Sequence, residues 1–230
     1  MQRYFNKIDK RYLLFFIVIF CLFVTWMAQD FRLYGGILTD PFHQGEYFAA
    51  LTTLLNSEKD FYPLTIHGAL DFIPGLISIN LFGPEAYFFQ TWFIYRLLNI
   101  FTAIVFVAVV FELVKQKPHR STIILVSAFI APFVVGYRDT ALILSIYLYF
   151  LIQRNKSPIT CVFLEIFLGS IVAVGVFWSF DRGIAAAISL GIACLINAFR
   201  NRIHLISIIV FTVVTIFLSS IFPQFSIANY

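Results

Sequence analysis

The sequence predicts an all-α integral membrane protein with about seven transmembrane helices in a single domain, residues 1–230. The chain is 60% hydrophobic, 19% aromatic and only 12% charged, and its mean hydropathy is +0.89. A soluble domain of this length could not cover so much apolar side chain with so few charges. Apolar runs long enough, or nearly long enough, to cross a bilayer recur along the chain. The predicted spans are residues 12–28, 87–114, 122–137, 140–152, 159–178, 184–199 and 205–222.

Lysine and arginine set the predicted orientation, because cytoplasmic loops carry an excess of positive charge. Of the 16 basic residues, 11 fall on one side: Arg3, Lys7, Lys10, Arg11, Lys115, Lys117, Arg120, Arg154, Lys156, Arg200 and Arg202. Nine of the 12 acidic residues fall on the other: Asp30, Asp40, Glu46, Glu58, Asp60, Asp71, Glu85, Asp139 and Asp181. We therefore expect a multi-pass protein of the cytoplasmic membrane with a cytoplasmic N-terminus and an acidic outer face. Topology accounts for the net charge of +4, which does not indicate nucleic acid binding.

One apolar stretch, residues 69–82, is not counted as a span. It contains Asp71, Pro74 and Gly75 and is too short to cross a bilayer comfortably. Counting it would also move every later loop to the opposite side and reverse the charge asymmetry. We predict instead a helix that lies at, or dips into, the outer interface. The long outer loop, residues 29–86, then carries two interfacial segments, at 46–56 and at 69–82.

The first interfacial segment carries candidate catalytic residues. Asp40, His43 and Glu46 come just before, or at, the start of the predicted helix. A carboxylate there can act as a general base toward a hydroxyl acceptor, and a histidine can share or deliver a proton. The alternative is that these residues only cap the helix, whose N-terminal dipole favours glutamate.

The second interfacial segment opens on His67 and Asp71, one helical turn apart. We interpret them as substrate-binding residues, and the alternative is that they hydrogen-bond locally and hold the loop. His67 and Asp71, together with His43 and Glu46, are of residue types that can bind a metal ion. The spacing is not that of a tight metal site, so we assign no metal ligands and no cofactor, and any requirement for a divalent metal stays open.

Two predicted outer turns also carry opposite charges, Arg138 with Asp139 and Asp181 with Arg182. Such pairs commonly form local ion pairs at the interface. Because both turns face the same side as the loop, they could instead line one polar cavity, where the arginines would bind phosphate. Arg96 lies nine residues into the second predicted span, about 14 Å from its outer end. A cation at that depth normally faces a partner or water, and we interpret it as a ligand for an anionic headgroup or as the partner of a structural carboxylate.

These features together resemble the membrane module of the GT-C glycosyltransferases, which use polyprenyl-phosphate-linked sugars, and especially the protein O-mannosyltransferases. In that superfamily the first span is followed by a long outer loop with an acidic catalytic motif and two juxtamembrane helices. The resemblance covers residues 12–113 in pattern and the whole chain in topology. The similar segments read His43-Gln44-Gly45-Glu46-Tyr47-Phe48-Ala49, then Asp60-Phe61-Tyr62, then Ile66-His67-Gly68-Ala69-Leu70.

The chain departs from the family pattern in two places. The usual Asp-Glu pair reads His43-Gln44, and the usual His-Pro-Pro reads His67-Gly68-Ala69. The resemblance therefore implies a catalytic carboxylate in this loop without singling out Asp40 or Glu46. We favour Asp40 as the base, with Glu46 positioning the acceptor or the donor. The alternative is that the activity has been lost.

The sequence thus predicts an enzyme that transfers a sugar from a polyprenyl-phosphate donor to a glycan, lipid or protein acceptor outside the membrane. The alternative is a non-catalytic carrier or flippase of lipid-linked sugars, or an assembly subunit. Members of this superfamily usually continue with further spans or a soluble domain beyond the point that corresponds to Tyr230. We therefore expect a truncated product, half of a split protein whose partner subunit supplies the C-terminal part, or a minimal module that needs a partner.

Overall fold

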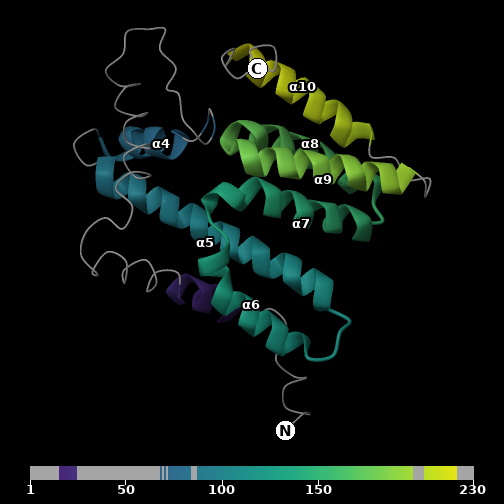
Figure 1. The fold of residues 1–230 in the computed structure, drawn as a ribbon, viewed down its shortest axis with the longest axis horizontal. Helices are drawn as coiled ribbons and strands as arrows, with labels where there is room; N and C mark the ends of the chain where they lie inside the picture. The colour runs from purple at the N-terminus through teal and green to yellow at the C-terminus, as the bar shows by residue number, and fades with distance from the viewer. Residues whose placement is uncertain are drawn as a thin grey trace.

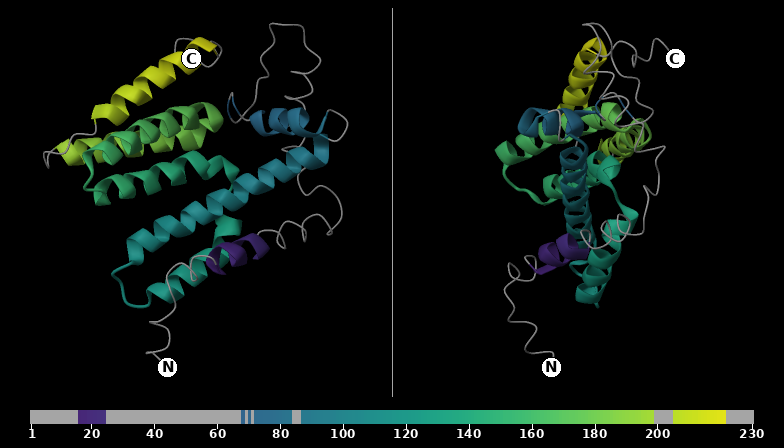
Figure 2. Two further views of the ribbon diagram at one scale, coloured as in Figure 1. Left: turned by 180° about the vertical axis from the view of Figure 1, so that it is seen from behind. Right: turned by 90° about the vertical axis from the view of Figure 1, so that its left-hand side faces the viewer.

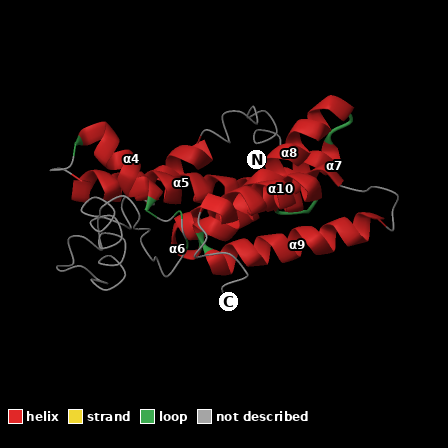
Figure 3. Ribbon diagram, turned by 90° about the horizontal axis from the view of Figure 1, so that it is seen from above, coloured by secondary structure: helices red, strands yellow, loops and turns green. Residues whose placement is uncertain are grey.

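The computed structural model describes residues 16–24, 68, 70, 72–83, 87–198 and 205–221. Within these ranges every regular element is a helix and none is a strand, as predicted (Figures 1 and 3). A helical segment at 16–24 comes first. The labelled elements are α4 (Ile73–Phe82), α5 (Tyr87–Val114), α6 (Arg120–Val134), the 3-10 turn η2 (Tyr137–Asp139), α7 (Thr140–Arg154), α8 (Pro158–Trp178), α9 (Phe180–Ala198) and α10 (Leu205–Ile221).

From α5 onward the helices run back and forth and pack side by side. Helix α8 contacts α7, α9 and α10, while α5 contacts α4, α6 and α7. Figures 1 and 2 show α7, α8 and α9 as a stack, with α10 on one side of it and α5 and α6 on the other. The predicted apolar runs from 87 onward therefore correspond to helices, and their faces meet in shared cores.

Three helical stretches are long and apolar enough to cross a membrane: Ile94–Val114, Pro158–Trp178 and Phe180–Asn197. Helix α6 and the η2–α7 stretch pass the same test only together, and they are bent by 108° at their junction. Helices α4 and α10 are shorter apolar helices. The first predicted span, 12–28, is described only at 16–24. These lengths and compositions support a helical membrane protein, and the described residues supply three candidate spans, or up to four if the bent pair is counted as one.

A cluster of ion pairs shows where the bent pair begins and ends. Glu112 lies near the end of α5, and its carboxylate accepts from Lys115 Nζ at 2.9 Å and from Arg154, the last residue of α7. The ends of α5 and α7 are therefore neighbours. The α6–η2–α7 segment leaves this end of the molecule and returns to it, so it forms a hairpin with its tip at η2.

The two largest buried clusters show how the helices pack. Ile17 and Cys21 of the first helical segment pack against α5 and α6, and the Cys21 thiol donates to Ala128 O at 3.5 Å. The second cluster joins α7, α8 and α9, and includes Leu148, Leu168 and Leu190. Many large apolar side chains on α6, α8, α9 and α10 remain exposed, as expected for helix faces that meet lipid.

The predicted helix at 69–82 corresponds to α4. Pro74 stands in its first turn, where its missing N–H costs nothing. Gly83 ends the helix at φ 88°, a left-handed value that favours glycine. Pro74, Gly75 and Ser78 form its buried face, and α4 packs against α5. The other predicted interfacial segment, 46–56, lies outside the described residues.

Candidate functional site

Half of the predicted site residues lie in the described part of the chain. Asp40, His43, Glu46, His67 and Asp71 lie outside the described residues. The structure places the other five on α5, η2 and α9: Arg96, Arg138, Asp139, Asp181 and Arg182.

The two charged turns meet and exchange partners. Arg138 Nη2 donates to Asp181 Oδ1 at 3.1 Å, and Arg182 Nε lies 3.1 Å from Asp139 Oδ1. Arg182 Nε also lies 3.6 Å from Asp181 Oδ2, its sequence neighbour. We call these four residues the Arg/Asp network. The two shorter ion pairs therefore join η2 to the start of α9, and only the longer Arg182–Asp181 contact stays within one turn.

Exposure differs across the network. The side chain of Asp139 is 17% exposed, whereas those of Asp181 and Arg182 are 56% and 50% exposed. The Arg138 side chain lies between, at 31%. Ser179 joins the network from the turn between α8 and α9, because its hydroxyl donates to Asp181 Oδ1 at 2.9 Å and accepts from Arg138 Nε at 3.3 Å. The network is thus held by Ser179 and the partly buried Asp139 on one side, and Asp181 and Arg182 are exposed on the other.

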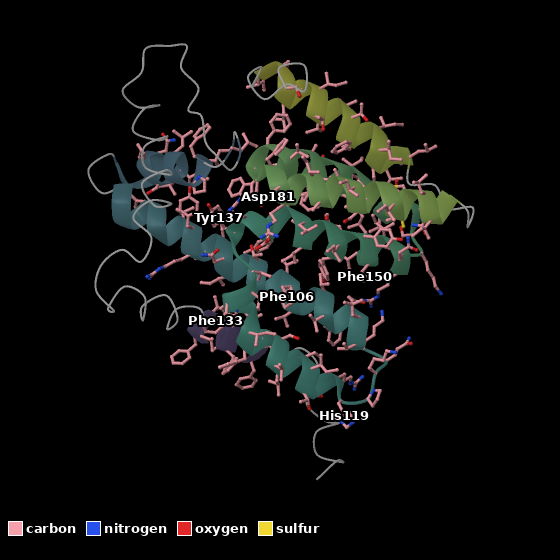
Figure 4. The ribbon with its side chains drawn as sticks, viewed as in Figure 1. Phe106, His119, Phe133, Tyr137, Phe150 and Asp181 are labelled. Atoms are coloured by element: carbon pink, nitrogen blue, oxygen red, sulfur yellow. The ribbon has the colours of Figure 1, made fainter. Side chains whose placement is uncertain are left out.

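The backbone of Tyr137, the residue before Arg138, is held in place by hydrogen bonds. Its N–H donates to Asn99 Oδ1 of α5 at 2.6 Å. Its carbonyl accepts from Thr140 Oγ1 at 2.5 Å and from Trp178 Nε1 at 3.2 Å. The Tyr137 ring also meets those of Tyr95 and Trp178 edge-on, with centroids 4.7 and 6.1 Å apart. Figure 4 shows Tyr137 and Asp181 close together where the tip of the α6–α7 hairpin meets the start of α9.

No role was assigned from the sequence to Asn99, Ser179 or Trp178. The available signal was positional, because Trp178 and Ser179 directly precede the charged turn at 181–182. Thr102 was also missed. Its hydroxyl lies 2.6 Å from that of Thr140, which ties the start of α7 to α5.

Two described residues of the long predicted loop, Gly68 and Leu70, lie against the same turn. Leu70 N donates to Phe177 O at 2.9 Å. A Cβ placed on Gly68 would come within 2.5 Å of the carbonyl oxygens of Phe177 and Trp178, so only glycine fits there. Leu70 and Phe177 share a small buried cluster. The chain at 68–70 therefore docks on the end of α8, one or two residues before Ser179.

Arg96 lies on α5, close to this region. It is nine residues past the start of the helix, as the sequence predicted. Its side chain is partly buried, and it stands one helical turn before Asn99, which accepts from the backbone N–H of Tyr137.

The network has the chemistry of an anion site with its cations held in place. A guanidinium has five N–H groups, and the bonds to Ser179 and the two aspartates use only some of them. The remaining N–H groups of the half-exposed Arg182 and the partly exposed Arg138 can donate to phosphate oxygens. Among the described residues there is no group of three or more His, Cys, Asp or Glu side chains that could hold a metal ion.

The fold and the site together define a helical membrane protein with a paired Arg/Asp network where two helical hairpins meet. In comparisons with known proteins, no family model, no curated protein and no solved structure matches the chain.

Proposed function

We propose that the chain is an integral membrane glycosyltransferase with a GT-C-like, seven-span arrangement. It moves a sugar from a polyprenyl-phosphate donor to a hydroxyl acceptor at the outer face of the cytoplasmic membrane. The observation that carries the proposal is the docking of Gly68 and Leu70 on the end of α8. This contact brings Gly68 and Leu70, in the second half of the loop that contains Asp40 and Glu46 in sequence, to the turn that holds the Arg/Asp network.

The arginines have the donor phosphate as their ligand in this proposal. The phosphate oxygens take the N–H groups of Arg138 and Arg182 that the aspartates leave over, and Arg96 adds a third positive charge nearby. Asp139 and Asp181 keep the guanidinium groups aimed, and Asp181, the most exposed of the four, can accept a hydrogen bond from the sugar. His67 and Asp71, on either side of the docked segment, complete the substrate-binding set.

The proposed reaction is a single displacement. The acceptor oxygen attacks the anomeric carbon, the bond from that carbon to the phosphate oxygen breaks, and polyprenyl phosphate leaves with the bonding electrons. The proton of the acceptor hydroxyl passes to Asp40 or Glu46 as general base, and His43 can share it. The arginines stabilise the charge that develops on the leaving phosphate.

The test is sugar transfer in proteoliposomes from a panel of radiolabelled polyprenyl-phosphate sugars. Wild type is compared with Asp40→Asn, Glu46→Gln and Arg138→Gln, and Lys156→Gln is the control because that lysine is exposed at the far end of the molecule. We expect one donor to turn over, the control to match wild type, and Arg138→Gln to lose about 100-fold.

The two carboxylate variants then identify the base. A collapse in Asp40→Asn or in Glu46→Gln assigns it, whereas full activity in both moves the chemistry out of the loop. Folded wild type that turns over no donor contradicts the enzyme and leaves the carrier of lipid-linked sugars as the better hypothesis.

A further inference from the structure

The distance between two charged layers bears on the membrane around this protein. One layer is the Arg/Asp network. The other, which we call the basic end, consists of Lys115, Lys117, Arg120, Arg154 and Lys156. Figure 4 shows the separation, with Tyr137 and Asp181 at one end of α7 and His119, in the loop before α6, toward the opposite end of the molecule.

Three helices give a consistent distance between the layers. From Asp139 to Arg154 along α7 is fifteen residues, about 22 Å. On α5, Asn99 bonds the Tyr137 peptide and Glu112 bonds Arg154, thirteen residues apart, or about 20 Å. On α8, Cys161 meets Ile152 and Asn155 near the end of α7, and Trp178 meets Tyr137, seventeen residues away, or about 25 Å.

This spacing is short for a bilayer. The hydrocarbon core of a typical membrane is about 30 Å thick, which is about 5 to 10 Å more than the separation of the two layers. Helices α5 and α8 match it, because their apolar stretches Ile94–Val114 and Pro158–Trp178 are each 21 residues long and so about 30 Å. Next to α5, the α6–α7 hairpin reaches only to the level of Asn99.

The network also needs water or polar headgroups. The Asp181 and Arg182 side chains are about half exposed, so in an undistorted bilayer they would face hydrocarbon. Half-exposed charges below the surface draw water and headgroups inward and thin the bilayer locally. At the basic end, Lys117, Arg120, Arg154 and Lys156 are exposed, which sets the position of the opposite membrane surface.

We propose that the bilayer is thinned beside the α6–α7 hairpin and the start of α9, so that the Arg/Asp network lies hydrated in a depression of the membrane surface. The lipid partner of this face is accordingly a bilayer with a hydrocarbon core nearer to 20 than to 30 Å. The inference depends on the spacing of the two charged layers and not on the proposed reaction.

The first test is thermal unfolding of the full chain in vesicles of monounsaturated phosphatidylcholines with acyl chains of about 14 to about 22 carbons. We expect the highest midpoint in the shorter lipids, about 4 °C or more above the midpoint in 18-carbon chains. A flat profile, or a maximum at about 18 carbons or longer, overturns the proposal.

A fourfold variant removes the charges of the Arg/Asp network and so lengthens the apolar part of the protein. Arg138→Leu, Asp139→Leu, Asp181→Leu and Arg182→Leu together extend the apolar belt at unchanged net charge, so the optimum should shift to longer lipids. The control pair, Lys117→Gln with Lys156→Gln, keeps the belt length and should keep the wild-type optimum. An optimum that stays in place in the fourfold variant contradicts the proposal.

A depth measurement decides the case even where the fourfold variant does not fold. With Trp26→Phe and Trp92→Phe, Trp178 is the remaining tryptophan and reports the level of the network. Lipids brominated at successive acyl positions should quench it most when the bromines lie near the headgroup. Strongest quenching by deep bromines would place the network in undistorted hydrocarbon and overturn the inference.

Discussion

At the scale of single residues, three polar side chains converge on the backbone of Tyr137: Asn99, Thr140 and Trp178. The Tyr137 N–H can form only one strong bond, and Asn99 accepts it. The Tyr137 carbonyl has two lone pairs and two donors. The backbone of Tyr137 is therefore more sensitive to the loss of Asn99 than to the loss of either donor to its carbonyl.

We expect this difference to be measurable. Asn99→Leu leaves a partly buried N–H without its acceptor and should lower the free energy of unfolding by about 2 kcal/mol. Trp178→Phe keeps the ring packing and leaves the carbonyl its bond from Thr140, so it should cost about 1 kcal/mol or less. Chemical unfolding in detergent micelles compares the two. Equal costs would show that the Tyr137 amide is not the sensitive group.

A second asymmetry concerns Glu112. Its side chain is 5% exposed, whereas those of its partners Lys115 and Arg154 are 36% and 53% exposed. If the carboxylate is removed, the cations can return to water, but if the cations are removed, the buried carboxylate has nowhere to go. We therefore expect Lys115→Gln with Arg154→Gln to cost about 3 kcal/mol and Glu112→Gln only about 1 kcal/mol.

The same unfolding measurement at neutral pH tests this order, with Lys117→Gln as the control, since that lysine is exposed. The reverse order would mean that the cluster contributes through its cations, for example by closing the loop between α5 and α6.

At the scale of elements, close approach of helix backbones decides which faces meet. A Cβ on Gly183 would lie 2.2 Å from Gly175 O, and one on Gly169 would lie 2.4 Å from Ser207 O of α10. These contacts let α8 pack tightly against α9 and α10, as small residues do between helices in membranes. The Gly175–Gly183 contact also sets where α9 starts, and hence where Asp181 and Arg182 stand relative to η2.

Two glycines on one helix provide a matched test. Gly183→Ala forces the α8–α9 turn open against backbone atoms, and we expect the thermal midpoint to fall by about 5 °C or more. Gly191→Ala on the same helix meets nothing within 4 Å and should leave the midpoint unchanged or raise it slightly, because alanine is the better helix former. A Gly183→Ala protein as stable as wild type would contradict the tight turn.

The elements were more predictable than their contacts. Apolar runs predicted helices that the structure contains at 87–114, at 159–178 and, within a few residues, at the other runs from 122 onward, because composition alone limits what a bilayer accepts. The crossed pairing of Arg138 with Asp181 was not predictable. It depends on two hairpin tips that reach one level, which follows from helix lengths and from the close approach of Gly175 and Gly183. Nor does an apolar run reveal the 108° bend between α6 and α7.

At the scale of the whole molecule, the hairpin path of α6 and α7 fixes which loops share a side. The Glu112–Arg154 ion pair holds the ends of α5 and α7 together, so the loops at 115–119 and 155–157 must lie on one side of the membrane. The sequence reached the same grouping from charge alone. The seven spans, the cytoplasmic side and the catalytic loop remain predictions.

Cysteine labelling tests the grouping. In a background with Cys161→Ser, Lys117→Cys and Lys156→Cys should both react with a membrane-impermeant maleimide from the same side, and we expect that side to be the cytoplasm. Reaction from opposite sides would mean that the chain crosses once between them, and would contradict the hairpin.

The cross-paired network also has an electrical consequence for biogenesis. Each hairpin tip carries one arginine and one aspartate side by side, Arg138 with Asp139 and Asp181 with Arg182. A tip with a net charge of zero gains or loses no electrical work when it moves through the membrane potential, whereas a single unpaired charge would gain or lose about 2.3 kcal/mol per 100 mV. Insertion of these two hairpins should therefore proceed equally well in energised and in uncoupled membranes.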